Sequence, residues 1–293
     1  MVGPEGRLPI VHTTLIATDV LAANLDSGWA LIDCRYDLND TTWGHTQYLD
    51  AHIPGAVYAS LSHDLSATPD GTNGRHPLPS PEAMAATFGR RGIGRDTQVV
   101  AYDQDAGMYA ARLWWMLRYM GHDAVAVLDG GYAKWVREGR PTRGGEESRP
   151  AVTFSGAPRA GWRLRVEEVE QRLQDPSILL VDARSADRFA GQNETMDRAA
   201  GHIPGAANHF YKQNVAADGT MLPPGRLREQ FSASVKGRPA SEVVMYCGSG
   251  VTACHNLLAM EHAGLSGAKL YPGSWSEWSS DPNRPRATGA TED

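Results

Sequence analysis

LIDCR at residues 31–35 and AHIPGA at residues 51–56 return later in the chain as LVDAR at residues 180–184 and GHIPGA at residues 201–206. In both copies an apolar run leads into an Asp-x-Arg segment, and a His-Ile-Pro-Gly-Ala segment comes next. Self-similarity of this kind is the mark of a repeated structural unit. We therefore expect the second half of the chain to fold like the first.

Two further pairs of segments follow in the same order. VVAYD at residues 99–103 matches VVMYC at residues 243–247, and LDGGYAKW at residues 128–135 matches YPGSWSEW at residues 271–278. Four matched segments in one order, separated by about 150 residues, indicate a duplicated domain rather than coincidence.

The length of 293 residues suits two domains of ordinary size. We expect them at residues 8–140 and 161–285. Residues 138–160 are rich in Gly, Pro, Arg and Glu, which predicts an exposed linker that wraps from one domain to the other.

Within each copy the apolar runs are continuous rather than alternating, which suits strands that are buried on both faces. These runs lie at residues 30–32, 99–102, 125–128, 178–181 and 243–246. Helical patterns separate them, as at residues 109–120 and at residues 251–263, where Gly264 ends the pattern. Alternating strands and helices predict an α/β fold in both domains, each with a mainly parallel sheet flanked by helices.

Residues 57–80 fit no regular element and include the segment SATPDGTNGRHPLPS. An irregular stretch of this length in a compact domain commonly has a function. We expect it to lie near the active site.

The composition excludes several classes of protein. Hydrophobic residues make up 41% of the chain, charged residues make up 21%, and the formal net charge is −6 without any run of Lys or Arg. A nucleic-acid partner is therefore not expected, and neither is a membrane span, because no stretch of about 18 apolar residues occurs. Three Cys without a CxxC pair predict a reduced, cytoplasmic protein with neither a disulfide framework nor a zinc site.

YCGSGVTACHNLL, from Tyr246 to Leu258, carries the strongest chemical signal. It places Cys247 at the carboxyl end of an expected strand, before a Gly-rich loop and a helix, which is where open α/β sheets bind ligands. Gly248 and Gly250 allow the loop to curl so that its N–H groups converge on the sulfur. Together with the positive end of the following helix, these groups favour a reactive thiolate or persulfide.

The other two cysteines and the first copy provide the comparison. Cys34 and Cys254 are expected to be small buried side chains. In the first copy the position of Cys247 is taken by Asp103, so that copy has no nucleophile. One domain is therefore expected to be catalytic and the other to shape the site.

The chain resembles the tandem-domain rhodanese proteins over almost its whole length. The resemblance rests on the duplicated order of four segments: DxR, HIPGA, the strand–loop–helix junction with the cysteine in the second copy, and G-x-W-x-x-W or its first-copy counterpart. The resemblance implies two rhodanese-like domains and a sulfurtransferase that carries sulfur as a persulfide on Cys247. The loop CGSGVTAC is similar to that of the mercaptopyruvate sulfurtransferases, whereas thiosulfate-preferring members carry basic residues where Gly248 and Ser249 stand here. The implied donor is therefore 3-mercaptopyruvate, which would leave as pyruvate.

The resemblance also assigns roles to individual side chains. Arg188 and Arg198 would hold the donor carboxylate, and Arg is apt because its planar fork can grip a carboxylate with two hydrogen bonds. Ser249, His76 and Asp64 would form a Ser-His-Asp set that acts on the thiol and carbonyl of the donor.

The backbone and side chains of the cysteine loop complete the expected substrate site, at Gly248, Gly250, Val251 and Thr252. His52, His202, Trp135 and Trp278 recur in both copies, so we expect them to support the fold, as we expect of Arg184.

The implied reaction is a two-step transfer in which a thiophile, such as cyanide, a small thiol or thioredoxin, takes the outer sulfur from Cys247. No metal or organic cofactor is expected, and the chain is expected to be a monomer with its active site between the domains.

Three other functions remain open. Thiosulfate could be the main donor, and a rhodanese-like module could bind a partner without catalysis. A phosphatase would need an Arg six positions after the cysteine, where this chain has Ala253.

Overall fold

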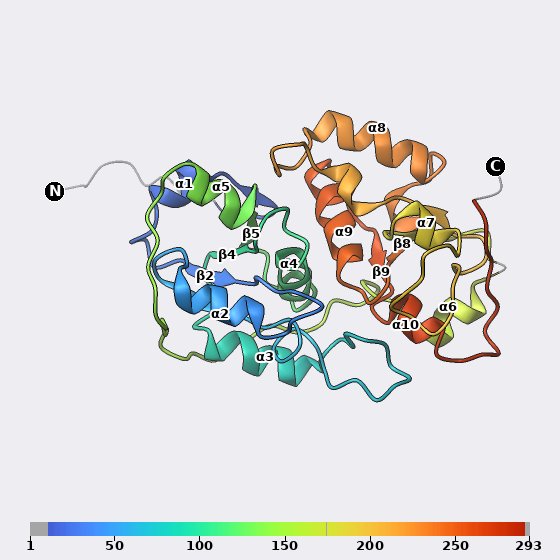
Figure 1. Ribbon diagram of the computed structural model, residues 1–293, viewed down its shortest axis with the longest axis horizontal. Helices are drawn as coiled ribbons and strands as arrows, with labels where there is room; N and C mark the ends of the chain where they lie inside the picture. Colours follow the sequence, from blue (N-terminus) through green and yellow to red (C-terminus); the bar gives the residue numbers. More distant parts are fainter. Residues whose placement is uncertain (1–10, 174, 291–293) are drawn as a thin grey trace.

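The computed structural model describes residues 11–173 and 175–290. Two α/β units lie side by side (Figure 1), the first coloured blue to green and the second yellow to red. The expected start of the first domain, at residue 8, lies outside the described residues. No helix in the described ranges is long and apolar enough to cross a membrane.

The first unit is a five-stranded, all-parallel sheet with the strand order β1-β5-β4-β2-β3. Its strands are β1 (Leu15–Ile16), β2 (Ala30–Asp33), β3 (Ala56–Tyr58), β4 (Val99–Tyr102) and β5 (Val125–Leu128). Its helices are α1 (Thr18–Ala22), α2 (Trp43–Asp50), α3 (Pro81–Arg90), α4 (Ala110–Tyr119) and α5 (Gly131–Arg137).

The second unit is a four-stranded parallel sheet with the strand order β7-β6-β8-β9. Its strands are β6 (Leu179–Asp182), β7 (Ala207–Asn208), β8 (Val243–Tyr246) and β9 (Lys269–Leu270). Its helices are α6 (Val166–Gln171), α7 (Ala186–Phe189), α8 (Pro224–Ser234), α9 (Thr252–His262) and α10 (Ser274–Trp278), with short 3-10 turns at η1 (Tyr211–Asn214) and η2 (Ala240–Glu242).

The continuous apolar runs form the central strands, as predicted. Every residue of β2, β4, β5 and β8 is buried, because helices cover both faces of each sheet. β6 begins one residue later than the predicted run and includes Asp182, whose carboxylate is satisfied by Arg184.

The Asp-x-Arg segments form the same buried ion pair in both domains. Nη2 of Arg35 donates to Asp33 at 2.6 Å and to the carbonyl of Ala51 at 2.8 Å. Nη2 of Arg184 donates to Asp182 at 2.6 Å and to the carbonyl of Gly201 at 2.7 Å. Each pair therefore fixes the end of its first central strand to the segment that leads into HIPGA.

The recurring His and Trp residues are structural, as predicted. Nδ1 of His52 lies 2.7 Å from the carbonyl of Tyr48, and Nδ1 of His202 lies 2.8 Å from that of Phe189. Trp135 and Trp278 are fully buried, and each donates its indole N–H to a proline carbonyl.

The segment between the domains runs over the surface of the first. The backbone of Arg143 pairs with His52, and Nη1 of Arg149 donates to the carbonyl of Trp29 at 2.8 Å. The irregular stretch after β3 leaves the first sheet and reaches the second domain, where the N–H of Arg75 donates to Oγ of Ser276 at 3.0 Å.

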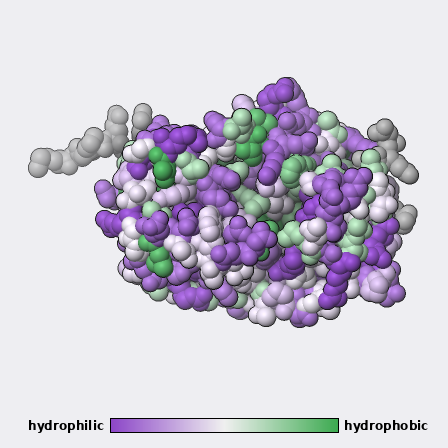
Figure 2. Space-filling model, in the orientation of Figure 1, coloured by the Kyte–Doolittle hydropathy of each residue, from purple (hydrophilic) through white to green (hydrophobic). Residues whose placement is uncertain are grey.

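The two domains meet along α4 and α9, which lie next to each other at the centre of the molecule (Figure 1). Buried residues of both helices, among them Trp114 and Leu258, belong to one hydrophobic cluster. Arg118 of α4 forms an ion pair of 3.3 Å with Glu261 of α9. Figure 2 shows a mostly hydrophilic face on which some hydrophobic residues lie along the middle, between the domains.

His255 of α9 is one of the buried titratable groups at this interface. It is fully buried, and its Nε2 lies 2.9 Å from the carbonyl of Ala106 in the first domain. Burial lowers the pKa of His255 from 6.5 to about 4. The folded protein therefore keeps this imidazole neutral at a pH where an unfolded chain would protonate it.

We predict that this histidine makes stability depend on pH. Its contribution is fully present above pH 6.5 and is lost as the pH falls towards 4, because only the unfolded chain takes up the proton in that window. The slope is about 1.4 kcal/mol per pH unit for one proton. His255→Gln keeps a donor for Ala106 but cannot titrate, so urea unfolding at a series of pH values should show a shallower slope by about that amount. Equal slopes in the two proteins would contradict the prediction.

Candidate functional site

Cys247 lies directly after β8, at the carboxyl end of the strand. Its N–H donates to Oγ of Ser274 at 3.0 Å, and its carbonyl accepts from the N–H of Trp275 at 2.9 Å, so the start of α10 holds its backbone. The side chain is only 2% exposed, yet it lines a cavity of about 300 Å³. The sulfur is thus sheltered from bulk water and reachable from the cavity.

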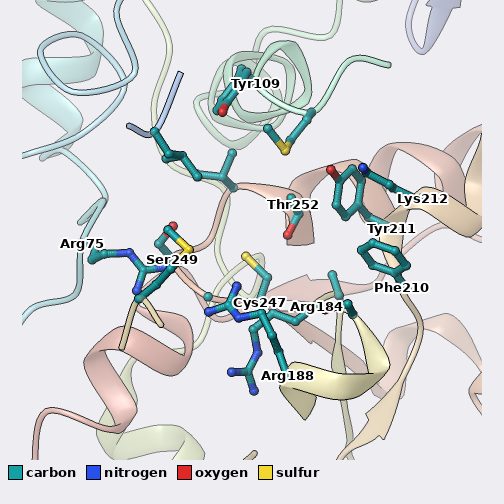
Figure 3. A pocket seen from close by; sticks show the side chains of 17 residues that line it. Arg75, Tyr109, Arg184, Arg188, Phe210, Tyr211, Lys212, Cys247, Ser249 and Thr252 are labelled. Carbon is teal, nitrogen blue, oxygen red and sulfur yellow. The ribbon is translucent and has the colours of Figure 1, made fainter. Parts of the chain in front are cut away.

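The loop after Cys247 curls so that its backbone meets the sulfur. The N–H of Gly250 donates to Sγ of Cys247 at 3.1 Å. Gly250 has a φ of +76°, and a Cβ at this position would lie 2.2 Å from the carbonyl oxygen of Pro272. Only glycine fits both the left-handed backbone and the close approach. Val251 and Thr252 also line the cavity (Figure 3), with Thr252 beginning α9.

The first domain builds the same arrangement around a carboxylate. Asp103 follows β4, and its oxygens accept from the N–H groups of Gly107 at 2.9 Å, Tyr109 at 2.7 Å and Ala110 at 3.1 Å. Burial nevertheless raises the pKa of Asp103 to about 6. In both domains the strand–loop–helix junction therefore directs backbone N–H groups at the side chain that follows the strand, three at Asp103 and one at Cys247, and only the second domain has a thiol there.

Ser249 and His76 come together although 173 positions separate them. Nδ1 of His76 lies 2.8 Å from Oγ of Ser249, so the irregular stretch of the first domain does reach the cysteine loop. Burial, together with the charges of Arg112 and Arg75, lowers the pKa of His76 to about 3. The imidazole is therefore neutral at physiological pH.

Asp64 does not join this pair. Its carboxylate forms an ion pair of 2.5 Å with Arg91 and accepts the N–H of Ser60 at 2.8 Å. No hydrogen bond connects it to His76 in the part of the chain that the structure describes. The groups whose charges act on His76 are cationic, so the geometry supports a Ser-His pair without Asp64 as its acid.

Arg188 of α7 lines the cavity beside Cys247, as expected of a substrate-binding residue. Its Nη2 donates to Glu194 at 2.9 Å and to Asp197 at 3.1 Å. Sequence reasoning missed Arg75, which also lines the cavity and donates through Nη1 to Asp197. The signal for it was its place beside His76 in GRHPLP.

Both guanidinium groups lie close to the cysteine loop. A Cβ at Gly248 would be 2.8 Å from Nη2 of Arg75 and 3.7 Å from Nη1 of Arg188. Figure 3 shows these two side chains flanking Cys247 and Ser249. The site thus presents the guanidinium groups of two ion-paired arginines next to a neutral loop position, which suits a small anion.

Arg198 lies elsewhere. It is exposed and lines a neighbouring cavity of about 420 Å³, which Arg75 and His76 also line, rather than the cavity around Cys247. The resemblance implied that Arg198 holds the donor carboxylate, but the structure does not place this residue in the cavity that Cys247 lines.

The opposite wall of the Cys247 cavity was not foreseen. It consists of Tyr109 from the start of α4 in the first domain and of Phe210, Tyr211 and Lys212 from the second. Burial raises the pKa of Tyr211 to about 12, so its hydroxyl stays protonated and can donate a hydrogen bond. Among the described residues, no group of three or more His, Cys, Asp or Glu side chains could hold a metal ion.

The other two cysteines have the surroundings of inert thiols. Burial raises the pKa of Cys254 to about 12 and raises that of Cys34 well above its ordinary value. Neither residue lines the cavity around Cys247. This agrees with the prediction that both are small core side chains.

Comparison with protein families gives two matches to the same model. Residues 17–138 and residues 165–281 each match the rhodanese-like domain. The first match begins just after β1, the second includes the whole second sheet, and both leave out most of the segment between the domains.

Curated proteins and solved structures match over most of the chain. A protein of Pseudomonas aeruginosa named "Probable 3-mercaptopyruvate sulfurtransferase" is 46% identical over 94% of this chain and 98% of its own length. The thiosulfate sulfurtransferase of Bos taurus is 33% identical over 92% of this chain and 91% of its own. The solved 3-mercaptopyruvate sulfurtransferase of Leishmania major superimposes with a TM-score of 0.83 at 32% identity, covering 91% of this chain and 74% of its own.

We predict that an alkylating agent distinguishes the three thiols. Iodoacetamide added to the folded protein should modify Cys247 alone, because Cys34 and Cys254 are buried away from the cavity and their pKa values are raised. Peptide mass spectrometry would identify the modified residue, with urea-unfolded protein as the control in which all three react. Modification of Cys254 before Cys247 would contradict this description of the site.

Proposed function

The chain belongs to the rhodanese family and is a sulfurtransferase, and we propose that Cys247 takes sulfur from 3-mercaptopyruvate and passes it to a thiophilic acceptor. The observation that carries the proposal is the loop around Cys247, in which Gly250 donates to the sulfur at 3.1 Å beside two arginines. Such a loop stabilises a thiolate before the transfer and a persulfide after it.

In the first half-reaction the donor carboxylate binds near Arg188 and Arg75. The thiolate of Cys247 attacks the donor sulfur, a new S–S bond forms, and the C–S bond of the donor breaks. The electron pair of that bond passes to carbon and oxygen as the enolate of pyruvate, which then takes up a proton on carbon. The donor's thiol proton leaves to solvent or remains on the persulfide.

The pair of Ser249 and His76 suits the oxygen at which charge develops. A neutral imidazole 2.8 Å from Oγ can orient the hydroxyl. The hydroxyl can then donate to the enolate oxygen, which is the kind of preorganised contact that lowers a barrier. We assign no role to Asp64 in this step.

In the second half-reaction an acceptor thiophile attacks the outer sulfur, and the thiolate of Cys247 is the leaving group. Cyanide, a small thiol or thioredoxin are the acceptors we propose. We also propose that the protein acts as a monomer in the cytoplasm, where its three unpaired cysteines would stay reduced.

Neutral residues at positions 248 and 249 favour a monoanionic donor over the thiosulfate dianion. Thiosulfate is the second candidate because Arg75 adds a positive charge that the loop itself lacks, only 2.8 Å from a Cβ at Gly248. We therefore expect both donors to react, with 3-mercaptopyruvate preferred.

The first test compares both donors on the wild type and on Cys247→Ser, with cyanide as acceptor. We predict a higher kcat/KM for 3-mercaptopyruvate than for thiosulfate and a loss of both activities in the variant, because a serine hydroxyl is a much weaker nucleophile than a thiolate. Sulfur transfer that survives in the variant would refute Cys247 as the carrier. A wild type without activity toward either donor would favour a module that binds partners without catalysis.

A second test places charge on the loop. The double variant Gly248→Arg/Ser249→Lys should lower the ratio of kcat/KM for 3-mercaptopyruvate to that for thiosulfate by about tenfold or more, equivalent to about 1.4 kcal/mol between the two transition states. Gly248→Ala/Ser249→Ala is the matched control, because it also removes the Ser249 hydroxyl but adds no charge. If both double variants change the ratio equally, the charge of the loop does not select the donor.

A further inference from the structure

Arg112 of α4 connects the two loops that form the site. It is fully buried in the domain that lacks the nucleophile. Its Nη1 donates to the carbonyl of Gly250 at 3.0 Å, and its Nη2 donates to the carbonyl of His76 at 3.2 Å and to that of Leu65 at 3.4 Å. One guanidinium thus bridges the cysteine loop of the second domain and the irregular stretch of the first.

The two residues that Arg112 holds are those that contact the reacting groups. Gly250 accepts from Arg112 through its carbonyl and donates through its N–H to the sulfur of Cys247. His76 accepts from Arg112 through its carbonyl and lies 2.8 Å from Ser249 through its imidazole. A shift of Arg112 would therefore displace both contacts together.

Arg112 differs from the other fully or nearly fully buried arginines in its charge balance. Arg35 and Arg184 each have a carboxylate at 2.6 Å. In the described part of the chain, Arg112 forms no ion pair. It donates to backbone carbonyls, and its side chain also contacts the thiol of Cys254. A buried charge without a counter-charge costs several kcal/mol, so an anion within its electrostatic reach would be strongly favoured.

The titratable groups close enough to act on the charge of Arg112 are the side chains of Cys254 and Cys247. Burial raises the pKa of Cys254 to about 12, so that thiol stays neutral. Cys247 is the one that the loop prepares to be an anion, as a thiolate or as a persulfide.

We propose that Arg112 is a positioning residue that locks the cysteine loop to the His76 loop and supplies the buried positive charge that balances the anionic sulfur of Cys247. This rests on the proposed role of Cys247. It also explains how the domain without a nucleophile takes part in the reaction, through a side chain that touches no substrate.

Several other charged or titratable groups surround the sulfur and act on it whether or not Arg112 is present. Those that line the cavity are Arg75, Tyr109, Arg184, Arg188, Tyr211 and Lys212, and those that contact the cysteine loop are His76 and Cys254. The test must therefore compare Arg112 variants with a control variant on the same helix, because both leave these groups in place and only the control keeps Arg112.

The experiment follows the rate of Cys247 alkylation by iodoacetamide as a function of pH, together with kcat/KM for 3-mercaptopyruvate. In Arg112→Met the pH of half-maximal alkylation should rise by about one unit or more, the usual effect of removing a nearby opposite charge. Its kcat/KM should fall by at least about tenfold, because Gly250 and His76 lose their common donor.

The matched control is Arg118→Met on the same helix. Arg118 pairs with Glu261 across the domain interface but does not touch either loop. It should lower the Tm and leave the alkylation profile unchanged. An unchanged profile in Arg112→Met, or an equal shift in both variants, would overturn the proposal, the latter because it would trace the effect to domain docking.

Arg112→Lys separates charge from geometry and serves if Arg112→Met does not fold. Lysine keeps the charge but lacks the planar fork that reaches carbonyls of two loops. We expect a wild-type alkylation profile with kcat/KM lowered by about tenfold. A raised profile, or an unchanged kcat/KM, would contradict the proposal.

The same data show whether the premise itself fails. If wild-type alkylation does not select Cys247, or if Cys247→Ser keeps its activity, the proposed function is wrong. If Cys247 behaves as proposed and Arg112 variants do not differ from the wild type, only this inference is wrong.

Discussion

The rest of the structure depends on one arrangement, in which backbone N–H groups converge on the residue that follows a central parallel strand. Asp103 and Cys247 occupy this position in the two domains. Asp103 accepts hydrogen bonds from three N–H groups of its loop, and the sulfur of Cys247 accepts one, from Gly250. The arrangement requires a tight loop, and in the second domain Gly250 is the residue that permits it. Duplication thus produced two junctions of the same plan. An acidic side chain fills the first, and the second holds a thiol that can react.

The domain without a nucleophile contributes much of the site. It supplies His76 and Arg75 from its irregular stretch, Tyr109 from the start of α4, and Arg112 from within that helix. These contributions depend on the close packing of α4 against α9, which buries a shared hydrophobic cluster. The mechanism that we propose therefore depends on the domain interface, although Cys247 and its loop belong to one domain.

Charge balance in the site explains two departures from the expected roles. Asp64 forms an ion pair with Arg91 and not with His76. Its carboxylate therefore stabilises the loop in which it lies. Arg198 is exposed at a neighbouring cavity, and Arg75 stands beside Arg188 instead. Glu194 and Asp197 accept from Nη2 of Arg188, and Asp197 also accepts from Nη1 of Arg75. That arrangement fixes their direction and leaves positive charge beside Gly248.

The amino-acid sequence alone predicted the duplicated α/β fold, the buried central strands, the cysteine loop with its glycines and the structural role of His52 and His202. These features leave local patterns that recur in the two copies, because apolar runs, glycine turns and helical periodicity are set by neighbouring residues. The packing of the folded chain was needed to show that Arg75 and Arg112 lie against the cysteine loop and that Asp64 pairs with Arg91. Gly250 and Arg112 are 138 positions apart. Their contact depends on how one domain packs against the other and on the path of an irregular loop, and neither leaves a periodic pattern in the sequence.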